Sequence, residues 1–199
     1  LLLARAAELE TTPSVLLQTA WTLVLAALTG QRDVCFGVTS SGRSAGLPEL
    51  TAAVGMFANL LPVRVVLDRQ ERVFALITRL GVAQVERHQH EHVSLEDLPR
   101  ATPGSALFES TLVYENFPIT EVRPDQQDLV IEPLRRFDRV PYPVDVAVMP
   151  GEHPMLWAVF RVRRFHGHEP ARVLALLAQT VQAVASNPDR PAGAILDEL

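Results

Sequence analysis

The sequence has 199 residues, 48% of them hydrophobic and 21% charged, a balance typical of folded globular proteins and not of disordered chains. The net charge is −5, so no basic field favours nucleic acid or an anionic membrane surface as a partner. This length allows one domain with a sizeable core, or two small domains.

A single cysteine, Cys35, excludes an intramolecular disulfide, and no apolar run approaches the ~18 residues that span a bilayer. Both observations favour a cytoplasmic protein without a membrane partner. Cys35 lies in the apolar run VCF, which is typical of a buried, inert thiol. The first residues, LLLARAAELE, include neither an initiator Met nor a cationic leader, so we expect the sequence to be part of a longer protein.

The first predicted helix begins at Thr11 or Thr12, has Pro13 in its first turn and ends at Gly30. Its apolar residues leave little polar face, so we expect it to be almost wholly buried. A short buried strand is predicted over 33–39. It leads into a Ser/Gly loop, SSGRSAGLPEL, where ligand contacts are expected because a rigid strand carries the loop.

The later segments alternate strand and helix patterns, with Pro, Gly or Asp between them. In chain order they predict a strand over 56–67, an amphipathic helix over 71–92, a short helix or turn over 94–98, a loop over 99–105, strands over 110–116, 129–137, 144–149 and 156–162, and a helix over 172–185. The tail after Pro188 is expected to add little. This order predicts an α/β fold in which helices pack on a mixed sheet.

The segment VGMFANLLPVR, residues 54–64, is the most informative stretch of the chain. It places Gly55 and Phe57 beside the amide of Asn59, among apolar neighbours, and ends on the charge of Arg64. An amide and a guanidinium that bracket an apolar strand indicate a built site more than plain core.

Three alternating histidines, at 88, 90 and 92, raise the question of a metal site. His88 and His92 have the i,i+4 spacing of helical ligands, but no glutamate follows His88 in the HExxH register. Imidazoles also suit the negative end of a helix dipole. We therefore predict no metal site and favour a surface or interface role for His88 and Gln89.

No pattern in the sequence predicts a self-sufficient catalytic centre, because GxSxG, P-loop and GxGxxG motifs are all missing. The segment YENFP at 114–118 ends a strand with Glu115 and Asn116 before a proline-directed turn. Either these residues belong to a site or Asn116 simply caps the strand through its backbone.

Taken together, these segments resemble the C-terminal lobe of a nonribosomal peptide synthetase condensation domain. The family motif VGxFxNxxPxR matches residues 54–64, the pattern HQ…(F/L)E is similar to His88-Gln89 through Leu95-Glu96, and EN(Y/F)P matches 115–118. The helix TPSVLLQTAW and the strand DVCFGVTSSGR also resemble their family counterparts. The resemblance covers essentially the whole chain, and the order of the motifs argues against chance agreement.

The resemblance implies a chloramphenicol acetyltransferase-like fold of two lobes, with residues 1–199 as the C-terminal lobe and the N-terminal lobe outside this sequence. Such domains join a donor acyl thioester to an acceptor amine, and each substrate is carried on the phosphopantetheine arm of a peptidyl carrier protein. The catalytic signature HHxxxDG belongs to the N-terminal lobe. This sequence has no His-His pair and no Asp-Gly. We therefore expect no catalytic residue and no bound cofactor here, and no activity from this chain alone.

The same resemblance implies roles for several residues. Phe57 and Asn59 are expected to line the acceptor tunnel between the lobes. Arg43 is expected to form an ion pair with the aspartate of the missing motif, with Arg64 as second choice. Five further residues occupy family-motif positions without an assigned role: Gly55, His88, Gln89, Glu115 and Asn116.

Two other functions remain open. One is a condensation-like module that binds a carrier protein or recruits a tailoring enzyme without chemistry, and the other is an acyltransferase of the same fold with a soluble acceptor. A lobe separated from its partner is also expected to expose an apolar face and to self-associate.

Overall fold

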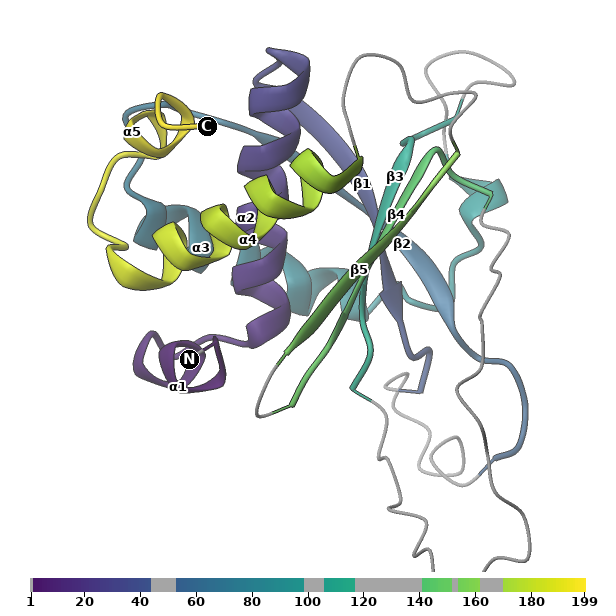
Figure 1. Ribbon diagram of the computed structural model, residues 1–199. Coiled ribbons are helices and arrows are strands. Elements are labelled where there is room, and N and C mark those ends of the chain that lie inside the picture. The colour runs from purple at the N-terminus through teal and green to yellow at the C-terminus, as the bar shows by residue number, and fades with distance from the viewer. Residues whose placement is uncertain (1, 44–52, 99–105, 117–140, 152–153, 162–169) are drawn as a thin grey trace, which may run out of the picture.

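The computed structural model describes residues 2–43, 53–98, 106–116, 141–151, 154–161 and 170–199. Within these residues one sheet has the strand order β2-β1-β3-β4-β5. Helices α1 to α5 gather on one face of this sheet (Figure 1). The strands are β1 Asp33–Ser40, β2 Asn59–Val66, β3 Ser110–Tyr114, β4 Val144–Met149 and β5 Met155–Phe160. The helices are α1 Leu2–Glu8, α2 Pro13–Thr29, α3 Val73–His88, α4 Pro170–Ser186 and α5 Ala192–Leu196, with the short 3₁₀ helix η2 at Leu95–Asp97.

The sheet is mixed, as the sequence predicts. β1 pairs antiparallel with β2, from Asp33 opposite Val66 to Ser40 opposite Asn59. β1 and β4 each pair with β3 in parallel, and β5 runs antiparallel to β4. Parallel neighbours need a crossover connection, and between β1 and β3 that connection contains β2 and α3.

The long helix α2 forms the centre of the helical layer and contacts both α3 and α4. Thr12 caps it by accepting a hydrogen bond from the Val15 amide, at 3.2 Å. At the other end Gly30 has a φ of 68°, and its amide donates to the Ala26 carbonyl. Eleven residues of this helix are buried, which confirms the prediction of an almost wholly buried helix.

The core lies between α2 and the inner face of the sheet, where strand residues alternate inward. Phe36 and Val63 are fully buried there, and Trp21 is 1% exposed. The Trp21 indole Nε1 donates to Ser110 Oγ at 3.3 Å, so its one polar group is satisfied inside the core.

The structure corrects several predicted boundaries. β2 begins at Asn59 instead of residue 56, and α3 ends at His88 instead of residue 92. The expected strand over 129–137 lies outside the described residues. The tail after Pro188, expected to add little, instead forms α5, in which Ala192 and Ile195 are buried. Helix α1 was also not predicted.

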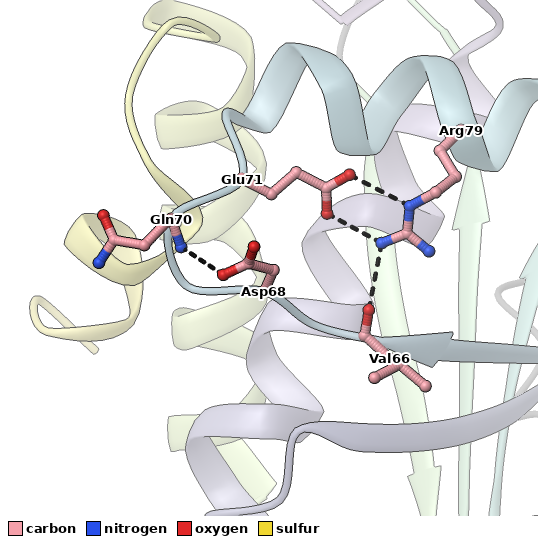
Figure 2. Close-up of polar contacts among 5 residues, drawn as sticks. All are labelled: Val66, Asp68, Gln70, Glu71 and Arg79. Atoms are coloured by element: carbon pink, nitrogen blue, oxygen red, sulfur yellow. Dashed lines mark hydrogen bonds and ion pairs between the residues drawn. The ribbon is translucent and has the colours of Figure 1, made fainter.

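A local polar network fixes the connection between β2 and α3 (Figure 2). Arg79 donates to both carboxylate oxygens of Glu71, at 3.1 and 2.9 Å, and to the Val66 carbonyl at 3.2 Å. The hydrogen bond from Arg79 to Glu71 raises the pKa of Arg79. Asp68 Oδ1 accepts from the Gln70 amide and tightens the turn. The start of α3 is therefore tied to the end of β2.

The outer face of the sheet carries residues of mixed chemistry. Val66 and Met155 lie on it at 59% and 54% exposure, on the two edge strands. The ring of Phe108 covers Gly37, where a Cβ would lie 2.5 Å from Cε2 of that ring.

In the described part of the chain no single helix is long and apolar enough to cross a membrane, and only α1 and α2 together reach that length and composition, across a bend of 102°.

Candidate functional site

The loop between β1 and β2, residues 41–58, contains three of the residues that the sequence singles out, Arg43, Gly55 and Phe57. Its described parts are 41–43 and 53–58. Arg43 joins them, because its guanidinium donates to the Ala53 carbonyl at 2.9 Å and to the Gly55 carbonyl at 3.4 Å. The same guanidinium lies 4.8 Å from the ring centroid of Phe57, within the range of a cation–π interaction. Arg43 and Phe57, predicted separately, are therefore in direct contact.

Gly42 permits this close approach of the two ends. Its φ is 65°, and a Cβ at this position would lie 1.8 Å from the Phe57 carbonyl oxygen. The sequence contains this glycine within SSGR, but its contact with residue 57 depends on the path of the loop.

Asn59 is the first residue of β2, and its side-chain amide forms hydrogen bonds within the chain. Its Nδ2 donates to the carbonyls of Glu91 and Val93, both at 2.7 Å, and its Oδ1 accepts from the Leu60 amide at 2.8 Å. The amide thus holds the turn at residues 89–93, which follows α3. The tunnel-lining role expected for Asn59 remains a prediction.

Glu91 is the residue of this region that sequence reasoning missed. Only 2% of it is exposed, and Ser40, itself 7% exposed, donates from Oγ to Glu91 Oε2 at 2.5 Å. A glutamate within the polar run RHQHEH is typical of a solvated helix end. Its burial follows from the turn at 89–93, which directs the side chain toward the end of β1.

Arg64 has a partner on its own sheet. It contacts Asp33 through two hydrogen bonds, Nε to Oδ1 at 2.9 Å and Nη2 to Oδ2 at 2.6 Å. The Arg64 side chain is 70% exposed, so this pair lies on the surface. The hydrogen bond from Arg64 lowers the pKa of Asp33. The second-choice residue for a cross-lobe pair is thus already engaged within the chain.

The remaining predicted residues lie at the ends of elements. His88 is the last residue of α3, and Gln89 follows it; both are exposed. The Glu115 amide donates to the Val148 carbonyl of β4 at 2.8 Å, and the Asn116 amide donates to the Tyr114 carbonyl at 3.1 Å. Among the described residues no group of three His, Cys, Asp or Glu side chains is arranged to hold a metal ion.

Two hollows adjoin the end of α3. A groove of about 660 Å³ lies between β2 and the end of α3, with Pro62, Gln89 and His90 among its lining residues. A small polar cavity of about 40 Å³ lies between α2, the end of β1 and α3, lined in part by Ser40 and Arg87. Burial lowers the pKa of Arg87, whose guanidinium donates to the buried Gln18 Oε1 at 2.9 Å.

A condensation domain family model matches residues 1–196. The chain belongs to the condensation domain family. It is 35% identical over 185 residues to one component of the linear gramicidin synthase of Brevibacillus parabrevis, a match that covers 91% of this chain and 2% of that protein. It is 34% identical over 151 residues to the chondramide synthase cmdD of Chondromyces crocatus, covering 74% of this chain and 4% of that protein. The chain therefore spans a small fraction of the length of these relatives.

Solved structures place this condensation domain chain in the predicted fold. The condensation domain of the monacolin K polyketide synthase MokA superposes with a TM-score of 0.75 at 21% identity, covering 96% of this chain and 45% of that one. The four-domain nonribosomal peptide synthetase AB3403, bound to AMP and glycine, gives a TM-score of 0.80 at 14% identity, covering 97% of this chain and 16% of that one. The predicted mixed-sheet, chloramphenicol acetyltransferase-like fold is confirmed.

Proposed function

We propose that this chain is the C-terminal lobe of a condensation domain that forms an amide bond in nonribosomal peptide synthesis. The observation that carries the proposal is the match of residues 1–196 to the condensation family, in a chain that covers 45% of a solved condensation domain. The other lobe of the domain would then supply the catalytic HHxxxDG signature, which this sequence lacks.

The reaction joins a donor acyl thioester to an acceptor amine, each delivered on the phosphopantetheine arm of a peptidyl carrier protein. That arm is a substrate carrier, and this chain supplies no group that reacts with it. Positioning two reactants lowers the barrier by several kcal/mol when the amine is held near the thioester carbon. The task of this lobe is to line the acceptor side of the tunnel and to support the other lobe.

The 41–58 loop is the part of this lobe best suited to that task. Arg43 is already oriented by two backbone carbonyls and by the Phe57 ring, so little side-chain freedom is lost when it meets a partner. Its role is a cross-lobe ion pair with the aspartate of the histidine motif. The pair holds the catalytic loop in shape but does not touch the reacting atoms.

Arg43→Ala in the intact domain tests this role. If the pair is buried between the lobes, losing Arg43 costs roughly 3–5 kcal/mol, so both the folded yield and the rate of amide formation should fall. The measurements are soluble yield, thermal midpoint and single-turnover product with both carrier-bound substrates. Arg172→Ala, a change of the same size on the exposed side of α4, is the matched control.

Normal yield and turnover in Arg43→Ala would contradict the assignment. Arg64→Ala separates the two arginines, because the pair of Arg64 with Asp33 is exposed to solvent and its loss should change stability little. If Arg64→Ala lowers the folded yield and the rate of amide formation more than Arg43→Ala does, the cross-lobe role belongs to Arg64.

The alternative function is a condensation-like module that binds a carrier protein or recruits a tailoring enzyme without chemistry. Such a module would have the same fold and the same 41–58 loop, so the two functions are distinguished by the sequence that precedes Leu1. The coding DNA before Leu1 should encode an in-frame HHxxxDG if the domain is catalytic. An eroded motif together with retained carrier-protein binding would favour the recruitment module.

A further inference from the structure

The 89–93 turn contacts both ends of the 41–58 loop. Ser40, the last residue of β1, lies opposite Asn59, the first residue of β2. Ser40 bonds the Glu91 carboxylate, and Asn59 bonds the carbonyls of Glu91 and Val93. The two strand ends at the base of the loop are therefore held by one short segment, and Glu91 is the residue common to both contacts.

The link through Glu91 continues toward Arg43. The Ser40 hydroxyl that donates to Glu91 also accepts from the Gly42 amide, at 3.4 Å. Gly42 in turn touches the Phe57 carbonyl so closely that only a glycine fits. A short series of contacts thus joins the Glu91 carboxylate to the backbone that carries Arg43 and Phe57.

Because Glu91 is buried, its hydrogen bond with Ser40 is stronger than the same hydrogen bond would be at the surface. A glutamate is almost never fully buried unless it is paired, and Glu91 is 2% exposed. Hydrogen bonds to a carboxylate are about twice as strong as neutral ones, and the low local dielectric strengthens them further. Removing the Ser40 hydroxyl deprives a buried carboxylate of a donor, which is more costly than losing a solvated contact.

We propose that Glu91 is a positioning residue that sets the base of the 41–58 loop through Ser40 and Asn59, and so places Arg43 and Phe57 for amide formation. The proposal rests on the proposed function of this lobe. Glu91 lies beneath the loop and touches no substrate, so it acts through the residues that the loop carries.

The test uses the intact domain, with both lobes, and compares Glu91→Ala, Ser40→Ala and Glu91→Gln. In Glu91→Ala and Ser40→Ala the single-turnover rate should fall by about tenfold or more, because small displacements of a positioning group cost one to two orders of magnitude. Glu91→Gln keeps an oxygen that accepts from Ser40 and should restore the rate to within about threefold of the parent domain. Glu86→Gln makes the same chemical change five residues earlier, at an exposed site in α3, and should have no effect.

Hydrogen exchange supplies a readout that is independent of chemistry. In Glu91→Ala and Ser40→Ala, amides of residues 41–43 and 53–58 should exchange faster, while those of β4 and α4 keep their protection. The double variant Ser40→Ala/Glu91→Ala should lose little beyond either single variant, since both changes break the same link. Ser40→Ala removes few atoms and keeps the proposal testable if Glu91→Ala does not fold.

Unchanged exchange of the loop in a folded Ser40→Ala or Glu91→Ala domain would overturn the proposal. Faster exchange with an unchanged single-turnover rate would also overturn it, by reducing Glu91 to a stabilising residue. If the parent domain forms no amide, the proposed function fails, and the exchange experiment still decides whether Glu91 sets the loop.

Discussion

Asp33 and Cys35 lie two residues apart on the outer face of β1, and their pKa values shift in opposite directions. The hydrogen bond from Arg64 lowers the pKa of Asp33, whereas burial raises the pKa of Cys35 above its ordinary value of 9.0. Arg64 lies directly opposite Cys35 in the β1–β2 pair and partly counters that rise. Partial burial therefore dominates for the thiol, and an ion pair dominates for the carboxylate.

The Cys35 thiol should consequently be slow to react. We expect iodoacetamide to label Cys35 in the folded protein at pH 8 at least about tenfold more slowly than in urea, because the thiolate is the nucleophile and burial disfavours it. Peptide-resolved mass spectrometry gives the rate at this position. Equal rates in both states would contradict the assignment of a protected thiol.

The raised pKa of Cys35 also determines how the stability of the fold changes with pH. The folded state favours the protonated thiol, so this contribution is present below pH 9.0 and is lost as the pH rises through the higher pKa of the folded state. For Asp33 the sign is opposite: the contribution is present above the ordinary carboxylate pKa and is lost as the pH falls. Cys35→Ser should therefore remove part of the alkaline destabilisation and leave the acid side unchanged.

At the scale of elements, α3 depends on the far end of the chain. Its N-cap residue, Arg72, makes no side-chain capping bond. The first-turn amides of Val73 and Phe74 instead donate to the carbonyls of Arg190 and Pro188, at 2.9 and 2.7 Å. The segment before α5 thus takes the place of a local cap and satisfies two of the amides that every helix start leaves free.

Two glycine substitutions should have opposite effects on stability. A Cβ at Gly193 would lie 2.8 Å from the Arg69 carbonyl oxygen, so Gly193→Ala should destabilise the fold by about 1–3 kcal/mol through overpacking. A Cβ at Gly81, within α3, meets nothing within 4 Å, so Gly81→Ala should stabilise by about 0.5–1 kcal/mol. Urea unfolding midpoints of the two variants give both values. Shifts of the same sign would contradict the packing assigned to α5.

The elements that sequence reasoning predicted are those with a local signal. Thr12, Pro13 and Gly30 mark both ends of α2, and the apolar stripe of α3 is periodic. Helix α5 has five residues and no side-chain cap, and it is held by contacts with Arg69 and Glu71, which no local pattern reveals. Its existence depends on tertiary structure.

The same distinction applies to the site. The motif at 54–64 was sufficient to single out Phe57 and Asn59, but their interaction partners lie on other segments. Glu91 was missed because its burial depends on the turn after α3, and the partner of Arg64 depends on the register of β1 against β2. Residue types were readable from the sequence, and pairings between distant segments were not.

At the scale of the whole molecule, the helices α1 to α5 lie on one face of the sheet, and the opposite face is the outer one (Figure 1). Val66 and Met155, on that outer face, are more than half exposed. A sheet with its main helices on one face is suited to packing its other face against a second body, as the proposed function requires.

If the proposed function holds, this chain expressed alone should self-associate. We expect light scattering to show oligomers that grow with concentration, and a hydrophobic dye to bind, because exposed apolar patches favour association. Co-expression with the N-terminal lobe is the control and should suppress both signals. A monomer at high concentration that binds no dye would sink this prediction.

The distant cap of α3 also has a consequence for synthesis on the ribosome. Helix α3 is made well before the carbonyls of Pro188 and Arg190 that its first turn needs. At ordinary translation rates the delay is on the order of ten seconds. During that interval the first turn of α3 lacks the acceptors of its Val73 and Phe74 amides. Emergence of residues 188–190 then supplies the two missing carbonyl acceptors and completes the first turn of α3.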